Sequence, residues 1–157
     1  MQNEKISIVP FRPAHFSALP LREEDEKDFR GIDIDTLLEC WADSVTYLYE
    51  GKPILIYGGS LQGGVASIHL VGSSAFGRLP LCICKEARKR VAELFAAGAH
   101  RVEAYCHEDN KRSLMWLVRM LGFRVEGLMR KSGPNAQGRF LLSLIDDDFN
   151  GGALGDR

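Results

Sequence analysis

The stretch HEDNKRSLMWLVRMLGF, residues 107–123, begins with polar residues, continues as an apolar segment and ends on Gly-Phe. Asp109 or Asn110 is a suitable helix cap, and the apolar residues that follow recur at helical spacing. Glycine is the usual residue just beyond a helix, so Gly122 marks its end. The stretch therefore predicts an amphipathic helix that leads into a strand, as in a small α/β domain.

The residues on either side of this helix continue the α/β pattern. Strands are predicted at 100–107 and 122–130, and LCICKEARKRVAELFAAG (81–98) predicts a helix whose charged face points to solvent. A helix between the strands at 65–71 and 102–106 requires those two strands to run parallel, through a right-handed crossover. Ligand sites in such sheets favour the carboxyl ends of the parallel strands.

The N-terminal part of the chain predicts the antiparallel part of the sheet. A first strand (6–12) precedes short helical segments and then three strands whose connections are too short for anything but antiparallel pairing. The acidic run 23–28 is expected on a solvated face. The predicted fold class is α/β, with a mixed sheet of about six or seven strands flanked by helices, in the order β-α-α-β-β-β-α-β-α-β-β.

Composition is that of an ordinary globular protein. The chain has 157 residues, 45% of them hydrophobic, and a formal net charge of −1, so neither nucleic acid nor a membrane is expected as a partner. One domain is predicted over 1–145, followed by a flexible acidic and glycine-rich tail at 146–157. No apolar run approaches the roughly 20 residues that cross a bilayer, and a cytoplasmic protein is expected. The cysteines lack metal-site spacing and are expected to be buried free thiols: Cys40, Cys82, Cys84 and Cys106.

The order of elements and the segment YCHEDNKRSLMWLVRMLGFRVEGLMRKSGPNAQGRF (105–140) resemble the GNAT superfamily of acyl-CoA N-acyltransferases. The shared features are a strand, an Asn followed three residues later by Ser, an apolar helix, and then LGF, EG and a basic residue. The topology extends the resemblance over residues 6–145, whereas the motifs cover 100–140. The resemblance implies a fold in which acyl-CoA lies between two central parallel strands that splay apart.

A narrower resemblance is to the small GNAT-like proteins of tailed bacteriophages, which include an internal virion protein of short-tailed phages. It rests on YEGKPILIYGG (49–59), on IHLVGSSAF (68–76) and on the Arg-rich helix that follows. This resemblance implies phage structural proteins, or a second copy of the chain, as partners. It also implies a place in the host cytoplasm and the virion.

The GNAT resemblance assigns cofactor contacts to the strand at 65–71, the loop at 72–81 and the start of the next helix. In the superfamily the strand pairs with the pantetheine arm, and the helix N-terminus binds the pyrophosphate, because helix starts favour anions. Asn110 matches the superfamily's cofactor-contacting Asn, and Ser113 the small polar residue after it. Both are equally explained as parts of a helix cap. The predicted acetyl-CoA contacts are Val71, Gly72, Ser73, Ser74, Gly77, Arg78, Asn110 and Ser113.

Two departures from the GNAT pattern weigh against ordinary catalysis. The loop GSSAFGRLPL (72–81) lacks the Gly-x-Gly spacing that lets the backbone approach the phosphates. Many active members carry a Tyr seven residues after the Asn, where it protonates the leaving thiolate, but this chain has Leu117 there. Because the spacing from Asn to Gly is one residue longer than usual, Val118 is the other candidate, and neither side chain can donate a proton.

Two titratable residues are the candidates for catalysis, if it occurs. His69 is the only titratable side chain within 65–71, and an unperturbed imidazole pKa of about 6.5 suits the removal of a proton from an amine. Tyr105, on the next strand, is the candidate acid. The alternative for both is a structural role in the sheet.

These features favour a GNAT-fold protein that has lost catalysis and serves as a virion or assembly component. The alternative is an active N-acetyltransferase that transfers an acetyl group from acetyl-CoA to a primary amine of a small molecule or a protein. Acetyl-CoA is the cofactor in the second case, and no cofactor need bind in the first. No metal site is predicted.

Overall fold

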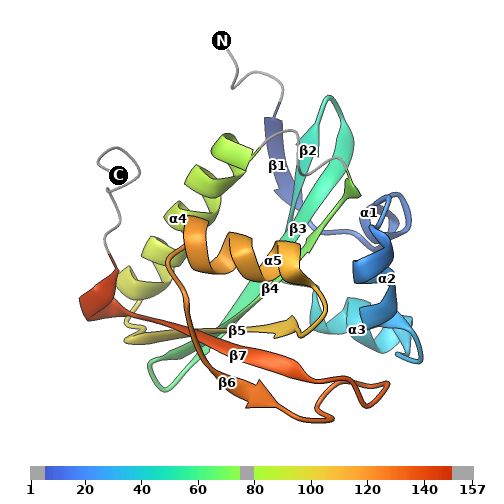
Figure 1. The fold of residues 1–157 in the computed structure, drawn as a ribbon. Coiled ribbons are helices and arrows are strands. Elements are labelled where there is room, and N and C mark those ends of the chain that lie inside the picture. Colours follow the sequence, from blue (N-terminus) through green and yellow to red (C-terminus); the bar gives the residue numbers. More distant parts are fainter. Residues whose placement is uncertain (1–5, 75–79, 150–157) are drawn as a thin grey trace.

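The computed structural model describes residues 6–74 and 80–149, with the backbone alone for residues 80–82. The described residues form one sheet with helices on both faces (Figure 1). The strands are β1 (Ile6–Pro10), β2 (Val45–Tyr49), β3 (Lys52–Gln62), β4 (Val65–Gly72), β5 (Arg101–His107), β6 (Arg124–Met129) and β7 (Arg139–Ile145).

The sheet confirms the predicted mixed topology. Its order is β1-β2-β3-β4-β5-β7-β6, and every neighbouring pair is antiparallel except β4 and β5. The two-residue turn at Glu50 and Gly51 joins β2 to β3, and both residues have a positive φ, of 49° and 77°. Such φ values match the right-handed twist of the paired strands.

Three short helices, rather than the two in the predicted order, separate β1 from β2. They are α1 (Pro13–Ser17), α2 (Glu23–Phe29) and α3 (Ile34–Cys40). Pro20 lies between α1 and α2, and Gly31, at a φ of 77°, lies between α2 and α3. Asp33 caps α3 by accepting a hydrogen bond from the Asp35 amide. The sequence provides a breaker at each junction, which is why the segment cannot form fewer, longer helices.

The helices divide between the two faces of the sheet. Helix α4 (Pro80–Ala96) and helix α5 (Lys111–Met115) lie over one face, where Ile83, Val91 and Leu117 share a core with the sheet. Helices α1–α3 lie over the other face, where Trp41 packs with Ile56 of β3. Side chains of a strand alternate between the faces, so β4 contributes to both cores.

The parallel pair of β4 and β5 opens after a short paired segment. Only Val65–Ser67 pair with Arg101–Glu103, although β4 continues to Gly72 and β5 continues to His107. Throughout its length β4 stays paired with β3, and β5 stays paired with β7. Beyond Ser67 the β4 edge that faces β5 therefore has no strand partner among the described residues. An unpaired edge offers backbone N–H and C=O groups to a ligand.

The helix after β5 changes from α-helical to π-helical geometry. Helix α5 ends at Met115 and continues as the π-helical turn η3 (Trp116–Met120), in which the Leu121 amide donates to the Trp116 carbonyl at 3.3 Å. This turn accommodates the extra residue between Asn110 and Gly122. It points Leu117 inward, at 5% exposure, and leaves Val118 at 37%. Of the two candidates, Leu117 is thus the residue at the position where many GNAT members carry a Tyr. Turns of π-helix are frequent near functional sites.

The start of the predicted flexible tail is folded against the domain. Asp146–Asp148 form the 3-10 turn η4, and the ring of Phe149 lies 5.0 Å from that of Phe95 on α4. Arg88 places its guanidinium over the Phe149 ring, 5.7 Å from its centre. Residues 150–157 lie outside the described residues, and flexibility there stays a prediction.

The cysteine predictions are confirmed in part. Cys84 and Cys106 are buried free thiols. The prediction is wrong for Cys40, which is exposed, because the last residue of α3 faces away from the Trp41 core. The side chain of Cys82 lies outside the described residues. Burial raises the pKa of the Cys106 thiol to about 12, so this thiol is protonated and unreactive at neutral pH.

Candidate active site

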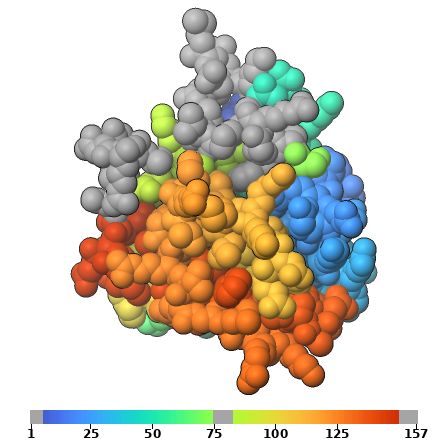
Figure 2. All heavy atoms as spheres, viewed as in Figure 1, coloured from blue at the N-terminus to red at the C-terminus, as the bar shows by residue number. Residues whose placement is uncertain are grey.

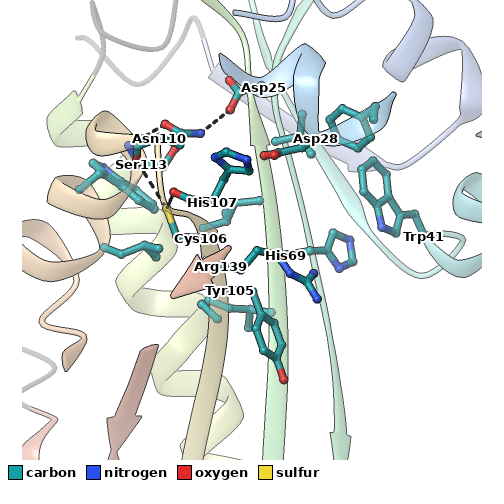
Figure 3. Close-up of a pocket in the computed structure, with 17 residues that line it drawn as sticks. Asp25, Asp28, Trp41, His69, Tyr105, Cys106, His107, Asn110, Ser113 and Arg139 are labelled. Carbon is teal, nitrogen blue, oxygen red and sulfur yellow. Dashed lines mark hydrogen bonds between the residues drawn. The ribbon is translucent and has the colours of Figure 1, made fainter. Parts of the chain in front are cut away.

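A pocket of about 280 Å³ lies where β4 and β5 diverge, and residues of both strands line it (Figure 3). Its walls come from both faces of the sheet. His69, Tyr105 and His107 face helices α2 and α3, whereas Cys106 and Leu117 belong to the core under α4 and α5. The opening between the strands therefore connects the two faces, which an intact sheet would separate.

The N-terminal helices contact the start of α5 directly. Asn110 donates from its side-chain amide to the carboxylate of Asp25 at 2.9 Å, and Asp25 also pairs with Arg22 at 2.7 Å. Arg22 in turn donates to the Ser113 hydroxyl at 3.1 Å. In the space-filling view the yellow-to-orange segment that leads from β5 into α5 abuts the blue N-terminal helices (Figure 2). Asp25 is only 8% exposed, so the prediction of a solvated acidic face is wrong here.

Asp28, one turn further along α2, lines the pocket. Burial raises the pKa of its carboxyl group, and the nearby Asp25 adds to this, while His107 and Arg139 act in the opposite direction. Asp28 makes no hydrogen bond or ion pair with another described residue. Figure 3 shows Asp28 and His107 facing each other. The pocket thus contains a partly buried carboxylate that no other described residue pairs with.

His107 is held in one tautomer by the backbone. Its Nδ1 accepts a 3.1 Å hydrogen bond from the Asp109 amide, so the proton of the neutral ring is on Nε2. The side chain is buried at the end of β5, between α2 and α5. His107 can therefore donate a hydrogen bond from Nε2 toward an anionic or carbonyl group.

His69 projects from β4 against the aromatic core of the N-terminal helices. Its ring stacks on Trp41, with centroids 4.9 Å apart and planes within 8°. Its Nε2 lies 3.0 Å from the Ser44 hydroxyl. Gly58 on the neighbouring β3 makes room, because a Cβ there would lie 2.5 Å from the imidazole. Burial lowers the pKa of His69 to about 4, so its ring is neutral at pH 7.

Tyr105 lies on the β5 side of the same pocket, 44% exposed. The guanidinium of Arg139 covers its ring, 5.3 Å from the centre. Arg139 is anchored by the loop before β7: its Nη2 donates to the Ser132 carbonyl at 2.8 Å and its Nε donates to the Ser132 hydroxyl at 3.3 Å. The two predicted catalytic residues, His69 and Tyr105, thus line one pocket, from different strands.

The residues predicted to bind acetyl-CoA divide into four pairs, of which Asn110 and Ser113 are the last. Val71 and Gly72 lie on the part of β4 whose edge toward β5 has no strand partner, and Val71 lines the pocket. The Ser73 amide donates to the Ile54 carbonyl and the Ser74 amide to the Pro20 carbonyl, each at 2.8 Å, so these two amides are already used. Gly77 and Arg78 lie outside the described residues. The open strand edge fits an extended pantetheine arm, because such an arm carries amides that can pair with it.

Asn110 and Ser113 form the helix cap that the sequence suggests, and they also line the pocket. The Asn110 side-chain oxygen accepts from the Ser113 amide at 3.2 Å, and its amide is the group that binds Asp25. Asn110 is 4% exposed. A cofactor contact by these residues stays a prediction, and it would use their remaining lone pairs or the Ser113 hydroxyl.

Asp25, Asp28 and Arg139 are not among the predicted site residues. Asp25 and Asp28 belong to an acidic run with no motif, and Arg139 is one of several basic residues near a turn. These three residues reach the pocket because α2 and the 130–138 loop pack against the open end of β5. The three-residue spacing of Asp25 and Asp28, which places both on one face of α2, was the single available signal.

The described residues contain no group of three His, Cys, Asp or Glu side chains arranged to hold a metal ion. No helix within the described part of the chain is long and apolar enough to cross a membrane.

A mixed seven-stranded sheet whose central parallel strands diverge around a pocket, with helices on both faces, is the GNAT acetyltransferase fold, and this chain has that fold. Ard1 from Thermoplasma volcanium matches with a TM-score of 0.70 at 13% identity, over 90% of this chain and 97% of that one. A GNAT-family acetyltransferase from Bacillus anthracis matches with a TM-score of 0.68 at 16% identity, over 91% and 96% of the two chains.

A third structure, yncA from Salmonella typhimurium with its cofactor acetyl-CoA, matches with a TM-score of 0.62 at 16% identity, over 90% of this chain and 94% of that one. No protein-family model matches the sequence, and no curated protein matches it. At these identities the likeness shows the fold alone, because one fold hosts many functions.

Proposed function

We propose that this protein is an N-acetyltransferase that transfers the acetyl group of acetyl-CoA to the primary amine of a small molecule. The observation that carries the proposal is the pocket at the opening between β4 and β5, which joins an unpaired strand edge to a group of titratable side chains. The match to a structure that contains acetyl-CoA supports the choice of cofactor.

The pocket supplies separate places for the two substrates. The free edge of β4 and the start of α5 lie beside the opening, where Val71, Asn110 and Ser113 are the residues suited to hold acetyl-CoA. On the other face, α2 and α3 contribute Asp28 and Trp41, a carboxylate and an apolar ring. A carboxylate in a partly dry pocket favours a cationic ligand such as an ammonium group.

Acetyl-CoA supplies an activated thioester, and the side chains of this chain move the protons. An ammonium group must lose a proton before its nitrogen can attack a carbonyl carbon. Asp28 is better suited to accept it than the predicted His69, because burial strengthens the basicity of a carboxylate but weakens that of an imidazole. His69 then acts with Trp41 as a wall of the amine site. Tyr105 is the hydroxyl donor for the leaving thiolate, since Leu117 has none.

The alternative, an inactive virion or assembly component, rests on the altered loop and on Leu117. None of the comparisons bears on a phage origin or on a structural role. Unpaired charge inside a pocket costs stability, and a protein with no ligand to bind has no need to retain it. The unpaired Asp28 therefore favours the enzyme over the inactive homologue.

The experiment is an assay of acetyl-CoA turnover against a panel of primary amines. Free CoA is measured with a thiol reagent and the acetylated amine by mass spectrometry. We expect CoA release that depends on the amine. We also expect kcat/KM to fall about a hundredfold or more in Asp28→Asn, which is the effect of removing a general base.

Glu24→Gln is the matched control, because Glu24 is exposed on the same helix and lies outside the pocket. It should leave turnover unchanged. The absence of amine-dependent CoA release at millimolar acetyl-CoA, from protein that is folded by circular dichroism, would overturn the proposal. Equal turnover in Asp28→Asn would overturn the role of Asp28 and leave the proposed reaction standing.

A further inference from the structure

The pocket contains two opposite charges that are not paired with each other. Asp28 on α2 and Arg139 at the start of β7 both line it, and the Arg139 charge acts on the Asp28 carboxyl group. They form no ion pair within the described part of the structure, although each has the other within electrostatic reach. Both side chains are only partly exposed.

The free carboxylate is held away from the ion pairs near it. Asp25, one turn earlier, takes the guanidinium of Arg22 and the amide of Asn110. These contacts satisfy Asp25 and leave Asp28 without a hydrogen-bond partner among the described residues. His107 faces Asp28 and adds a donor on its Nε2.

Arg139 is held so that one side of its guanidinium is fixed and the other is free. Its Nε and Nη2 contact Ser132, and its plane lies over Tyr105. Its Nη1 has no hydrogen bond to another described residue. An anchored guanidinium binds a carboxylate with little further loss of side-chain freedom, and it offers N–H groups in a planar fork.

We propose that the acceptor is a small zwitterion, an amino acid whose amine binds at Asp28 and whose carboxylate binds at Arg139. This inference rests on the proposed function and adds the class of its substrate. One molecule with both charges neutralises both free groups together, whereas a simple amine leaves Arg139 unpaired and a simple acid leaves Asp28 unpaired. Leaving a partly buried charge unpaired is costly.

The remaining walls define the rest of the substrate. Trp41 and His69 form a stacked pair, and Phe29 lies beside them in the pocket. His69 is neutral at pH 7, so this wall carries no charge. It suits the apolar side chain of an amino acid such as leucine, methionine or phenylalanine.

The reaction on such a substrate is balanced without any further reagent. The ammonium nitrogen gives one proton to Asp28 and attacks the thioester carbon. The new C–N bond forms as the C–S bond breaks, and the nitrogen loses its second proton. One proton goes to the thiolate sulfur to give free CoA, and the other is released to solvent from Asp28.

The test is a binding measurement on the whole chain, with and without CoA, that requires no turnover. Leucine, methionine and phenylalanine are each compared by calorimetry with two analogues, the amine that lacks the carboxylate and the acid that lacks the amine. At least one of the amino acids should bind about tenfold or more tightly than both of its analogues. Arg139→Gln should abolish the preference for that amino acid over its amine, while Arg139→Lys restores part of it.

Arg130→Gln is the control, since Arg130 is exposed and outside the pocket. Binding of the amines as tight as that of the amino acids, or no binding of any amino acid, would overturn the inference. Acetyl transfer to amines without such a preference would leave the proposed function intact. Selective amino-acid binding with no acetyl transfer would support amino acids as the ligand and overturn the proposed acetyl transfer.

Discussion

The side-chain amide of Asn110 donates a 2.9 Å hydrogen bond to the carboxylate of Asp25, which lies 85 residues earlier in the chain. This bond joins α5, whose first turn lines the pocket, to α2, the helix that carries Asp28. Asn110 uses its other side-chain group to cap α5 through the Ser113 amide. Together with the Arg22–Ser113 hydrogen bond, this one buried residue links the two sides of the pocket.

Asn110→Ala should lower the free energy of unfolding by about 1–3 kcal/mol, because it removes a helix cap and one partner of the buried Asp25. Urea titration measures the change. Asp109→Ala is the neighbouring control, since the Asp109 side chain is 83% exposed and should change stability by less than about 0.5 kcal/mol. Equal effects of the two substitutions would contradict the role of Asn110.

His69 should make the protein less stable as the pH falls from about 6.5 to 4. Its pKa in the folded protein, about 4, is below the ordinary value of 6.5, so the unfolded chain binds the proton more readily in this range. The loss is at most about 3.5 kcal/mol, from about 1.4 kcal/mol for each pKa unit. Urea titrations of the wild type and His69→Gln at pH 7 and pH 4.5 measure it. A stability difference between the two proteins that does not change with pH would refute the assignment.

Asp28→Asn should stabilise the protein at pH 7. Burial raises the pKa of Asp28 above its ordinary value, so ionisation of this carboxyl group opposes folding. The loss of stability is fully present at a pH above the pKa of the folded protein. It is absent at a pH below the pKa of the unfolded chain. The melting temperature of Asp28→Asn should exceed that of the wild type at pH 7, and the advantage should vanish under strongly acidic conditions. Glu24→Gln should show neither effect, and a destabilised Asp28→Asn would show that Asp28 has a structural partner.

Gly58→Ala should displace His69 from Trp41. A Cβ at position 58 would lie 2.5 Å from the imidazole and closer still to the Ser44 hydroxyl, so both side chains would have to shift. Overpacking of this kind costs about 1–3 kcal/mol. Gly127→Ala on the edge strand β6 is the matched control, because its Cβ would meet no atom within 4 Å. Urea titration of both variants compares them, and equal stability would mean that the His69 site is loosely packed.

Most of the fold could be predicted from the sequence because its signals are local. The turn at Gly51, the cap at Asn110 and the short connections of the antiparallel strands each follow from a few neighbouring residues. The parallel pair follows from the helix between its strands. The π-helical turn could be suspected only from the one-residue excess after Asn110, and the structure shows that Leu117, not Val118, faces the pocket.

The pocket could be predicted only in part. His69 and Tyr105 were accessible because they lie on the two strands that must diverge. Asp28 and Arg139 were not, since their position depends on how α2 and the loop before β7 pack on the end of β5. The low pKa of His69 was also beyond the sequence, because it depends on burial against Trp41, a contact between residues 28 positions apart in the chain.

A calorimetric titration of the protein with acetyl-CoA measures whether the pocket binds this cofactor. We predict one site with a micromolar Kd, and binding about tenfold weaker or worse in Ser113→Glu. That variant places an acidic residue in the first turn of α5, where the helix dipole tolerates it, so the fold is retained while the cofactor phosphates are repelled. The absence of binding by the wild type at millimolar acetyl-CoA would contradict the account, whatever the protein does with amines or amino acids alone.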